Sequence, residues 1–363
     1  MRFLFLLPAI VLALLVQGAG AVDFGVNTPP RGERPSAEPY STGWSVYIDN
    51  DWFGGADRNY TAGFAVGLSG RRATESALSL DPALQTINGW FGLERLFGAR
   101  EALRHHNISF GLLMFTPQKL SDTAPIFDDR PYACLLFATN SEQVALARAQ
   151  TAYQMSFTLG LLGTSLCKSL QTELHDLLGA EEPRGWSHQI SDGGEPTFQW
   201  SLSRQQLLAR SAGNGLRHEV MGMAMGAVGF TTQLAAGLAW RWGRIRSPWW
   251  SFLPHHVEYV NLGGPGAKGA GSANGAGELY LSVRAIGRYQ FYNAFLQGQF
   301  RGSDVEFTHS DLEPLIGEAW VGVTKTLKSG LEVSFSLRSR SREVKGFDGP
   351  TPVWGSVTLR RVF

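Results

Sequence analysis

The chain has 363 residues, and its 32 basic and 31 acidic residues give a formal net charge of +1. Charged residues make up 17% of the chain, below the roughly 25% of typical soluble domains, whereas its 43 glycines exceed the usual share of about 7%. With aromatic residues at 12%, this composition excludes a disordered chain. It also argues against nucleic-acid binding, because no excess of basic residues exists to neutralise phosphates.

The first 21 residues predict an export signal. Arg2 forms a short basic region, residues 3–16 are apolar, and residues 19–21 read Ala-Gly-Ala, a signal-peptidase pattern. The apolar run is too short to span a bilayer, and the alternative is an uncleaved membrane anchor. We therefore expect a signal peptide over 1–21 and one exported domain over 22–363.

After the signal, apolar and polar residues alternate along most of the chain. Residues 331–338 read LEVSFSLR, a period of two that is typical of a strand with one apolar and one polar face. A strand of about ten residues, tilted by about 45°, crosses the hydrocarbon layer of a membrane. The pattern predicts twelve strands, at 44–50, 61–70, 106–115, 132–143, 151–161, 196–209, 216–228, 231–243, 277–290, 313–327, 331–342 and 353–363.

A sheet exposed to lipid must close, because an open edge leaves backbone groups without hydrogen bonds. We therefore predict an all-β fold, a transmembrane antiparallel up-and-down β-barrel of about 12 strands with a polar lumen. The final residue, Phe363, resembles the C-terminal signal of bacterial outer-membrane barrels. We assign 291–300 to a loop and expect periplasmic turns at 144–150, 229–230 and 328–330. Residues 71–105 have a helical character that the barrel pattern does not explain.

In such a barrel the odd-numbered links lie on the extracellular side. The first, third and fifth links (51–60, 116–131 and 162–196) are also those with unusual polar content. In the fifth, Gln171 and His175 are four residues apart and share one face of a predicted short extracellular helix. An apolar stripe adjoins this face, consisting of Leu174, Leu177 and Leu178.

Three sequence blocks carry a resemblance to a known family: DND…ADRNYTAG (49–63), DDRPYA (128–133) and QTELHDLLGAEEPRGW (171–186). Their order and spacing resemble the outer-membrane lipid A 3'-O-deacylase (LpxR) family, over nearly the whole exported chain. The resemblance implies a twelve-stranded barrel in the bacterial outer membrane, with its active site facing the extracellular side. It further implies a calcium-dependent carboxylic ester hydrolase that removes the 3'-linked acyloxyacyl group of lipid A, with lipopolysaccharide in the outer leaflet as its partner.

The resemblance and the chemistry of ester hydrolysis together suggest four catalytic residues. His175 is the candidate general base, because the pKa of an imidazole lies near the working pH; the alternative is a histidine on a solvated helix. Gln171 would orient His175 or the substrate, and Thr61 would orient water or donate to the substrate. Asn50, paired with Asp51 as in the family, would offer its amide oxygen to a calcium ion that stabilises the oxyanion; the alternative is an Asx-turn that ends the first strand.

The resemblance also implies a calcium site. Asp51 is the first candidate ligand, since carboxylate and amide oxygens suit a hard cation, and such an ion would act as a Lewis acid next to the scissile carbonyl. Glu181 is the second candidate, although a surface charge is an equally simple explanation.

Three arginines are candidates to bind lipid A phosphates, because a guanidinium group binds phosphate bidentately: Arg58, Arg130 and Arg184. For the first two, the alternative is a buried ion-pair network with Asp57 and Asp129 that holds the links in place.

Two competing functions remain, an outer-membrane phospholipase and a non-enzymatic, porin-like barrel. Large inward side chains at positions 338, 340 and 342 would fill the lumen and oppose a porin. The protein is expected to be a monomer. Cys134 and Cys167 are hypothesised to form a disulfide on the extracellular side, as an exported protein permits; the alternative is two small buried side chains.

Overall fold

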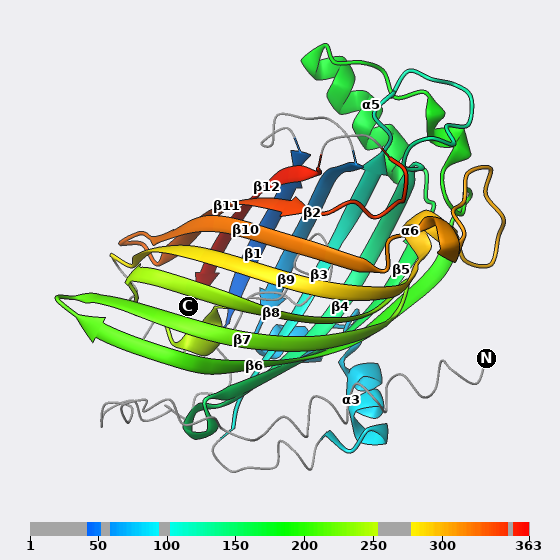
Figure 1. Ribbon diagram of the computed structural model, residues 1–363. Helices are drawn as coiled ribbons and strands as arrows, with labels where there is room; N and C mark the ends of the chain where they lie inside the picture. Colours follow the sequence, from blue (N-terminus) through cyan, green and yellow to red (C-terminus); the bar gives the residue numbers. More distant parts are fainter. Residues whose placement is uncertain (1–41, 52–58, 94–101, 253–276, 348–350, 363) are drawn as a thin grey trace.

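The computed structural model describes residues 42–51, 59–93, 102–252, 277–347 and 351–362. The predicted signal peptide, Asp57, Arg58 and Phe363 lie outside these ranges. The described chain forms twelve strands (Figure 1), namely β1 (Gly43–Asn50), β2 (Asn59–Ser69), β3 (Leu103–Thr116), β4 (Ala133–Leu146), β5 (Thr151–Leu162), β6 (Glu195–Gly213), β7 (Leu216–Gly229), β8 (Thr231–Arg244), β9 (Leu279–Asn293), β10 (Leu315–Thr326), β11 (Leu331–Arg340) and β12 (Val353–Val362). Its helices are α2 (Arg71–Glu75), α3 (Asp81–Trp90), α5 (Leu166–Leu178) and α6 (Ala294–Gln297), with 3-10 turns η2 (Ala147–Ala149), η3 (Gly185–His188), η4 (Trp249–Ser251) and η6 (His309–Asp311).

The twelve strands form one closed antiparallel barrel, in which β1 pairs with β12. The closing pair runs from Gly43 opposite Val362 to Asn50 opposite Gly355. Closure gives every strand of the described barrel a hydrogen-bonded neighbour on both sides, as a sheet in lipid requires. The predicted all-β barrel is therefore confirmed, with strand limits that differ from the predicted ones by at most four residues.

The segment predicted as a loop at 291–300 is partly regular. β9 continues to Asn293, because the turn at Phe230 is so tight that β8 begins at Thr231, directly opposite Asn293. Asn293 then caps α6, since its side chain accepts a hydrogen bond from the Phe295 backbone N–H at 3.0 Å. The loop assignment was therefore wrong for residues 291–297.

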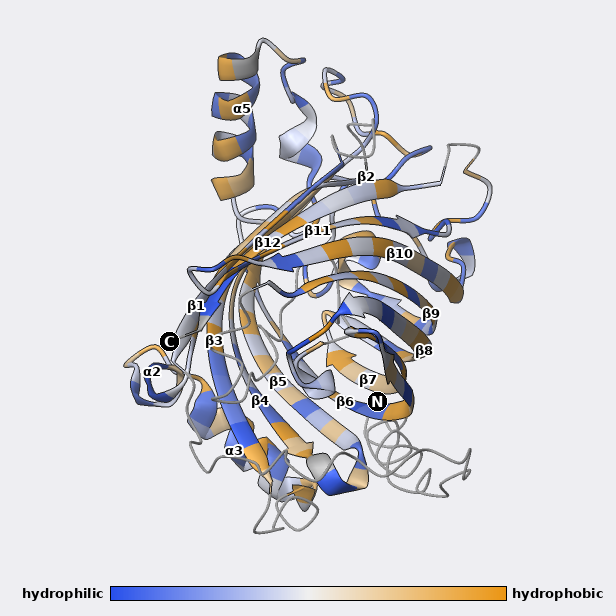
Figure 2. Ribbon diagram, turned by 90° about the vertical axis from the view of Figure 1, so that its left-hand side faces the viewer, coloured by the Kyte–Doolittle hydropathy of each residue, from blue (hydrophilic) through white to orange (hydrophobic). Residues whose placement is uncertain are grey.

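The two faces of the strands differ as the alternating sequence predicts. All twelve residues of β10 alternate between exposed and buried. On β9, the outward Leu281 and Val283 are 45% exposed, whereas the inward Ser282 is buried. Figure 2 shows hydrophobic and hydrophilic residues alternating along the strands. The outer wall is therefore suited to lipid, and the inner wall is polar.

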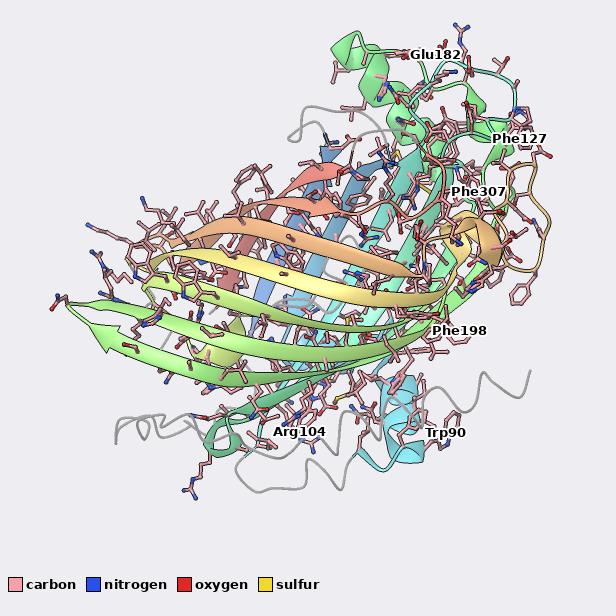
Figure 3. All side chains as sticks on the ribbon, viewed as in Figure 1. Trp90, Arg104, Phe127, Glu182, Phe198 and Phe307 are labelled. Atoms are coloured by element: carbon pink, nitrogen blue, oxygen red, sulfur yellow. A yellow bond between two sulfur atoms is a disulfide. The ribbon has the colours of Figure 1, made fainter. Side chains whose placement is uncertain are left out.

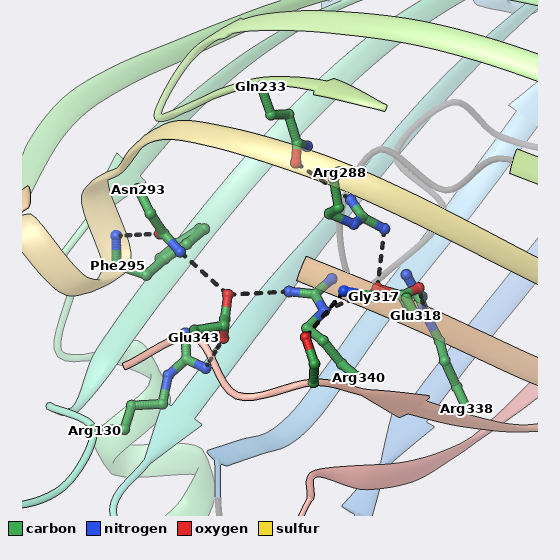
Figure 4. A network of polar contacts seen from close by, with 11 residues as sticks. Arg130, Gln233, Arg288, Asn293, Phe295, Gly317, Glu318, Arg338, Arg340 and Glu343 are labelled. Carbon is green, nitrogen blue, oxygen red and sulfur yellow. Dashed lines mark hydrogen bonds and ion pairs between the residues drawn. The ribbon is translucent and has the colours of Figure 1, made fainter. Parts of the chain in front are cut away.

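Charged side chains cross-link the lumen (Figure 4). Glu318 on β10 is fully buried and accepts hydrogen bonds from Arg288 at 3.0 Å, from Arg340 at 2.8 Å and from Arg338. The second carboxylate of this network, Glu343, accepts from Arg340 at 3.3 Å. These inward arginines fill the lumen as predicted for positions 338 and 340, which opposes the porin-like alternative.

Residue 342 departs from that prediction. Arg342 follows the end of β11 and is exposed, so it does not contribute to filling the lumen. β11 ends at Arg340, and the alternation of inward and outward positions ends with it.

We use the term helix end for the rim of the barrel that carries α5 and α6. The odd-numbered links all lie at this end, because β1, β3, β5, β7, β9 and β11 finish there. The turn at Phe230 belongs to it, since the Ala294 N–H, next to α6, donates to the Phe230 carbonyl at 2.7 Å. The turn at 229–230 therefore lies at the opposite end of the barrel from 144–150 and 328–330, so the prediction that all three turns lie on one side was wrong. Its shortness is not a guide to the side, because the order of strands decides it.

The helical segment between β2 and β3 packs on the outside of the barrel. Leu84 of α3 and Leu93 are fully buried in a cluster with the outward residues Met155 and Leu202. Phe91 stacks on Trp200 of β6 with ring centroids 4.9 Å apart. No helix in the described part of the chain is long and apolar enough to cross a membrane.

This segment covers polar groups on the lipid-facing wall. Asn140 on β4 points outward, and its Oδ1 accepts from the Leu80 N–H at 2.8 Å while its Nδ2 donates to the Ala73 carbonyl. Glu142, two residues further on, accepts from Gln85 at 3.1 Å and from Arg104 at 2.8 Å. Unpaired polar groups are costly in lipid. The helical segment within residues 71–105, which the barrel pattern did not explain, therefore covers the polar side chains of Asn140 and Glu142.

We predict that Leu84→Asp releases α3 from the barrel wall. Burying a leucine contributes about 2 kcal/mol, so its loss should raise the population of the released segment more than tenfold. Trypsin cleavage at the exposed Arg71 and Arg72, followed by mass spectrometry on the detergent-solubilised protein, measures this population. Leu78→Asp is the matched control, because Leu78 is 66% exposed. Equal cleavage rates in both variants would contradict the packing described.

Candidate active site

The fifth link between strands carries the helix that holds two of the predicted residues. α5 has 13 residues and is therefore about 20 Å long. It ends at Gly179, whose φ of 65° is left-handed and favours glycine. The Ala180 N–H then donates to the His175 carbonyl at 2.9 Å, so the chain turns back beside the last helical turn. The predicted short helix around Gln171 and His175 is confirmed.

A disulfide fixes the first turn of α5 to the outside of the barrel. Cys167 is bonded to Cys134 of β4, and their Cα atoms are 5.9 Å apart. Cys134 lies opposite the outward Met114 of β3, which in turn lies opposite Ala62 of β2. These residues belong to one cluster, which also holds the buried Trp186. The hypothesised disulfide is confirmed, and it attaches α5 to the outer wall formed by β2, β3 and β4.

The two faces of α5 are reversed relative to a helix of a soluble protein. Cys167, Gln171 and His175 are spaced by four residues, share one face and are at most 6% exposed. Leu174 and Leu177, in contrast, are 48% and 81% exposed. A helix in water usually buries its apolar stripe and exposes its polar residues. In α5 the polar residues are buried near the wall instead.

His175 has a fixed orientation. Its Nδ1 lies 2.5 Å from the backbone carbonyl of Glu181, which the turn at Gly179 brings back to the helix. A carbonyl only accepts hydrogen bonds, so Nδ1 must carry the proton. Nε2 then holds the lone pair, and it makes no hydrogen bond with any residue that the structure describes. A buried imidazole with a defined basic nitrogen is suited to proton transfer.

Gln171 lies one helical turn before His175 and also has a fixed orientation. Its Oε1 accepts from the Trp186 indole N–H at 2.8 Å, and because this indole can only donate, the amide cannot be flipped. Trp186 is itself held by Tyr132, with ring centroids 4.7 Å apart. The Nε2 group of Gln171 is buried and finds no acceptor among the described residues. Such an unsatisfied donor is costly unless a ligand or water accepts from it.

Asn50 and Thr61 lie together where β1 and β2 meet the rim. The Asn50 Nδ2 donates to the Thr61 carbonyl at 3.0 Å, which leaves Oδ1 as the acceptor atom of this amide. A bulge between Tyr60 and Ala62 places Thr61 out of the regular alternation. The Thr61 hydroxyl lies 2.5 Å from that of Thr116 on the outer side of β3.

Three of the four predicted catalytic residues adjoin the apolar cluster that holds Cys167 and Trp186, and His175 lies one helical turn beyond Gln171. Ala62, which is next to Thr61 and opposite Asn50, packs against the cluster that contains Cys167 and Trp186. Gln171 touches the same cluster through Trp186. Asn50 and Thr61 of the wall and Gln171 of the helix thus adjoin one apolar cluster, which is built on outward-facing residues of β2, β3 and β4.

The structure shows no contact between the two predicted metal ligands, Asp51 and Glu181, among its described residues. Asp51 follows β1 directly and is 2% exposed. Glu181 is exposed, and its contact with His175 uses the backbone carbonyl rather than the carboxylate. Within the described residues, no group of three His, Cys, Asp or Glu side chains could hold a metal ion. The donors near the rim are nevertheless all oxygens, which is the chemistry that calcium prefers.

The predicted phosphate-binding arginines do not gather at this site. Arg130 points into the lumen, where it is buried, ion-paired with Glu343 at 2.9 Å and stacked 4.0 Å from the centre of the Phe115 ring. This geometry favours the alternative of a buried ion pair, although the partner is Glu343 and not an aspartate of the same link. Arg184 is exposed and pairs with Glu182 at 2.8 Å.

Two residues that support the site had no role assigned from the sequence. Trp186 fixes the Gln171 amide, and Thr116 contacts the Thr61 hydroxyl. Trp186 ends the third of the sequence blocks that carry the family resemblance, so its place in that block was the available signal. Thr116 carried no signal, because its contact with Thr61 joins residues 55 positions apart.

A histidine outside this cluster connects three links at the helix end, because His188 of the fifth link contacts the third and ninth links. His188 Nδ1 lies 2.5 Å from the carboxylate of Asp304, and its Nε2 lies 3.0 Å from the Thr123 carbonyl. The hydrogen bond to Asp304 raises the pKa of His188 above its usual value, and the Thr123 carbonyl adds to the effect. Both partners accept hydrogen bonds, so the protonated imidazolium is the form that holds the third, fifth and ninth links together.

We predict that this contact weakens as the pH rises. Because the folded-state pKa of His188 is raised, its contribution is complete below about 6.5, the usual value, and is lost as the pH passes through the higher folded-state pKa. Trypsin cleavage at the exposed Arg184 and Arg301, measured between pH 6 and 9, should accelerate with pH more in the wild type than in Asp304→Asn. The same pH dependence in both proteins would show that the contact does not hold the links.

Comparisons with known proteins identify the setting of this site. Residues 7–363 match the model of a family described as "Outer membrane protein LpxR". Among solved structures, LpxR from Salmonella typhimurium is similar with a TM-score of 0.68 and 16% sequence identity, over 88% of this chain and 100% of that one. The β domain of the Bordetella autotransporter BrkA matches with a TM-score of 0.42 and 10% identity, over 90% of this chain and 100% of that one, which is too low to support an argument. A comparison with curated protein sequences finds no significant relative.

Proposed function

The chain belongs to the LpxR family of outer-membrane proteins, and on this basis we propose that it is a lipid A deacylase that hydrolyses the 3'-linked acyloxyacyl ester in the outer leaflet. The observation that carries the proposal is the pair formed by His175 and Gln171. Both are buried on α5, whose first turn is attached to the outer wall, and one offers a basic nitrogen while the other offers an amide donor. An ester hydrolase needs both groups, and a lipid substrate needs them on this side.

His175 acts as the general base in this proposal. The Glu181 carbonyl keeps the proton on Nδ1, so Nε2 accepts a proton from water as the water oxygen attacks the ester carbonyl carbon. When the tetrahedral intermediate collapses, Nε2 returns this proton to the departing 3'-oxygen. The products are the free acyloxyacyl acid and lipid A with a 3'-hydroxyl group.

Gln171 stabilises the charge that develops on the carbonyl oxygen. Its Nε2 group is oriented by Trp186 before the substrate binds, so it requires no reorganisation during the reaction. A single preorganised donor of this kind contributes about 10²- to 10³-fold in rate. The Thr61 hydroxyl, held by Thr116, orients the attacking water or donates to the substrate.

A calcium ion fits the oxygen donors at the rim, and its participation is part of the proposal. Asn50 Oδ1 and the Asp51 carboxylate would hold the ion, with the Glu181 carboxylate as a third candidate ligand. When bound, the ion would supply a positive charge that stabilises the oxyanion.

The remaining roles follow from the substrate. Lipid A lies in the outer leaflet, so we place the helix end on the extracellular side and treat the protein as a monomer. The exposed Arg184 is suited to a lipid A phosphate, whereas the lumen-facing Arg130 is suited to holding Glu343. Arg58, outside the described residues, stays a candidate for phosphate binding. A phospholipase would use the same base and donor, so the experiment must distinguish the two substrates.

We predict that the purified protein removes one acyloxyacyl group from lipid A and that His175→Ala abolishes this activity. Loss of the general base should lower the rate by about 10²- to 10⁴-fold. Mass spectrometry of lipid A and of phospholipids, after incubation in mixed micelles with calcium or with a chelator, measures both substrates in one sample. His188→Ala is the matched control, because His188 lies in the same link and contacts Asp304 instead of the cluster.

Several outcomes would contradict the proposal. Cleavage of phospholipids with intact lipid A would indicate the phospholipase. Lipid A cleavage that survives His175→Ala would keep the reaction and exclude His175 as the base. Cleavage that is unaffected by the chelator would remove calcium from the mechanism.

A further inference from the structure

A stripe of leucines runs along α5 beside the buried face that carries Gln171 and His175. The four leucines recur at intervals of four, four and three residues and therefore share one side of the helix. Their exposed fractions increase along the helix from 37% to 81%, in the order Leu166, Leu170, Leu174 and Leu177. A soluble protein rarely exposes a continuous apolar stripe of this kind.

This stripe continues the lipid-facing surface of the barrel. It begins next to Cys167, which is bonded to the outward Cys134. Two residues along the same face of β4 is Leu136, which is 37% exposed and lies opposite Leu161 of β5, itself 44% exposed. The exposed apolar surface of β4 and β5 therefore continues onto the leucine stripe of α5.

The opposite side of α5 is polar. At 100° per residue, Lys168 lies about 160° around the helix from Leu170, and Asp176 lies about 160° from Leu174. Both residues are exposed. Figures 1 and 3 show α5 leaving the rim of the barrel, with Glu182 beyond its far end and away from the strands. The helix is thus amphipathic and stands clear of the barrel, as helices that lie in a membrane interface do.

We propose that α5 lies in the outer leaflet, with its leucine stripe inserted among the lipid acyl chains and its Lys168 and Asp176 side in contact with headgroups and water. The inference rests on the proposed function only for the choice of leaflet. In this position the helix holds His175 and Gln171 at the boundary between acyl chains and headgroups, where the ester bonds of a lipid lie. A lipid molecule then reaches the site by lateral diffusion, without leaving the membrane.

Spin labelling tests this position directly. The two cysteines of the chain are joined in the disulfide, so a single introduced cysteine accepts one nitroxide label. We would compare Leu170→Cys with Lys168→Cys, and Leu174→Cys with Asp176→Cys, in liposomes of phospholipid and lipopolysaccharide. Each pair consists of exposed positions two residues apart. The two labels of a pair therefore lie on different sides of the helix but at nearly the same position along its axis.

Collision of the label with oxygen, which concentrates in lipid, is measured against collision with a water-soluble nickel chelate. We expect labels at 170 and 174 to favour oxygen at least fivefold more than their partners at 168 and 176. Equal access of all four labels to the nickel chelate would overturn the proposal, because α5 would then stand in water. Protection of positions 170 and 174 from both reagents would also overturn it, because a protein surface would then cover the stripe. Neither measurement depends on turnover, so a failed deacylase assay leaves this test intact.

Discussion

The constraint on which the structure depends is that lipid offers no hydrogen-bond partner. It requires the twelve strands to close from β1 to β12, and it makes an uncovered polar side chain costly on the outer wall. Inside the barrel, where no lipid reaches, Glu318 and Glu343 are paired with four arginines (Figure 4). Separating one partner from such a buried pair is strongly destabilising. The lumen is therefore occupied by structural ion pairs, and the outer wall is the surface where a lipid can meet catalytic groups.

On the outer wall, helices protect the polar residues that the strands expose. At one end, the segment with α2 and α3 covers Asn140 and Glu142 of β4. At the other end, α5 is attached through the Cys134–Cys167 disulfide and presents Gln171 and His175 on its buried face. The two arrangements differ in one respect. Asn140 is paired with the covering segment, and Glu142 is paired with Gln85 of that segment and with Arg104 of β3, whereas the Gln171 amide keeps a donor that finds no acceptor among the described residues. By this criterion the segment with α2 and α3 is a structural cover, and α5 carries a candidate active site.

The sequence predicted the barrel and its limits well, because the alternation of outward and inward residues is local and each strand shows it separately. The spacing of Gln171 and His175 likewise predicted a shared helical face. The links have no such period, and here prediction failed. The direction of Arg130 depends on Glu343, more than two hundred residues away. The outer position of α3 depends on contacts with β4, β5 and β6. The burial of the polar face of α5 depends on the Cys134–Cys167 disulfide, and the sequence supported this disulfide only as a hypothesis.

The central claim is that the chemistry occurs on the outer wall below α5 and not in the lumen. Photo-cross-linking tests it most directly, with lipid A that carries a diazirine at the end of its 3'-linked acyl chain, in proteoliposomes of His175→Ala. Peptide mapping should find labelled residues at Gln171 on the buried face of α5 and around Ala62, at several times the yield obtained with a diazirine phospholipid of equal chain length. Labelling concentrated on lumen residues such as Trp320 or Arg338, or equal labelling of Gln171 and Ala62 by both probes, would contradict the claim.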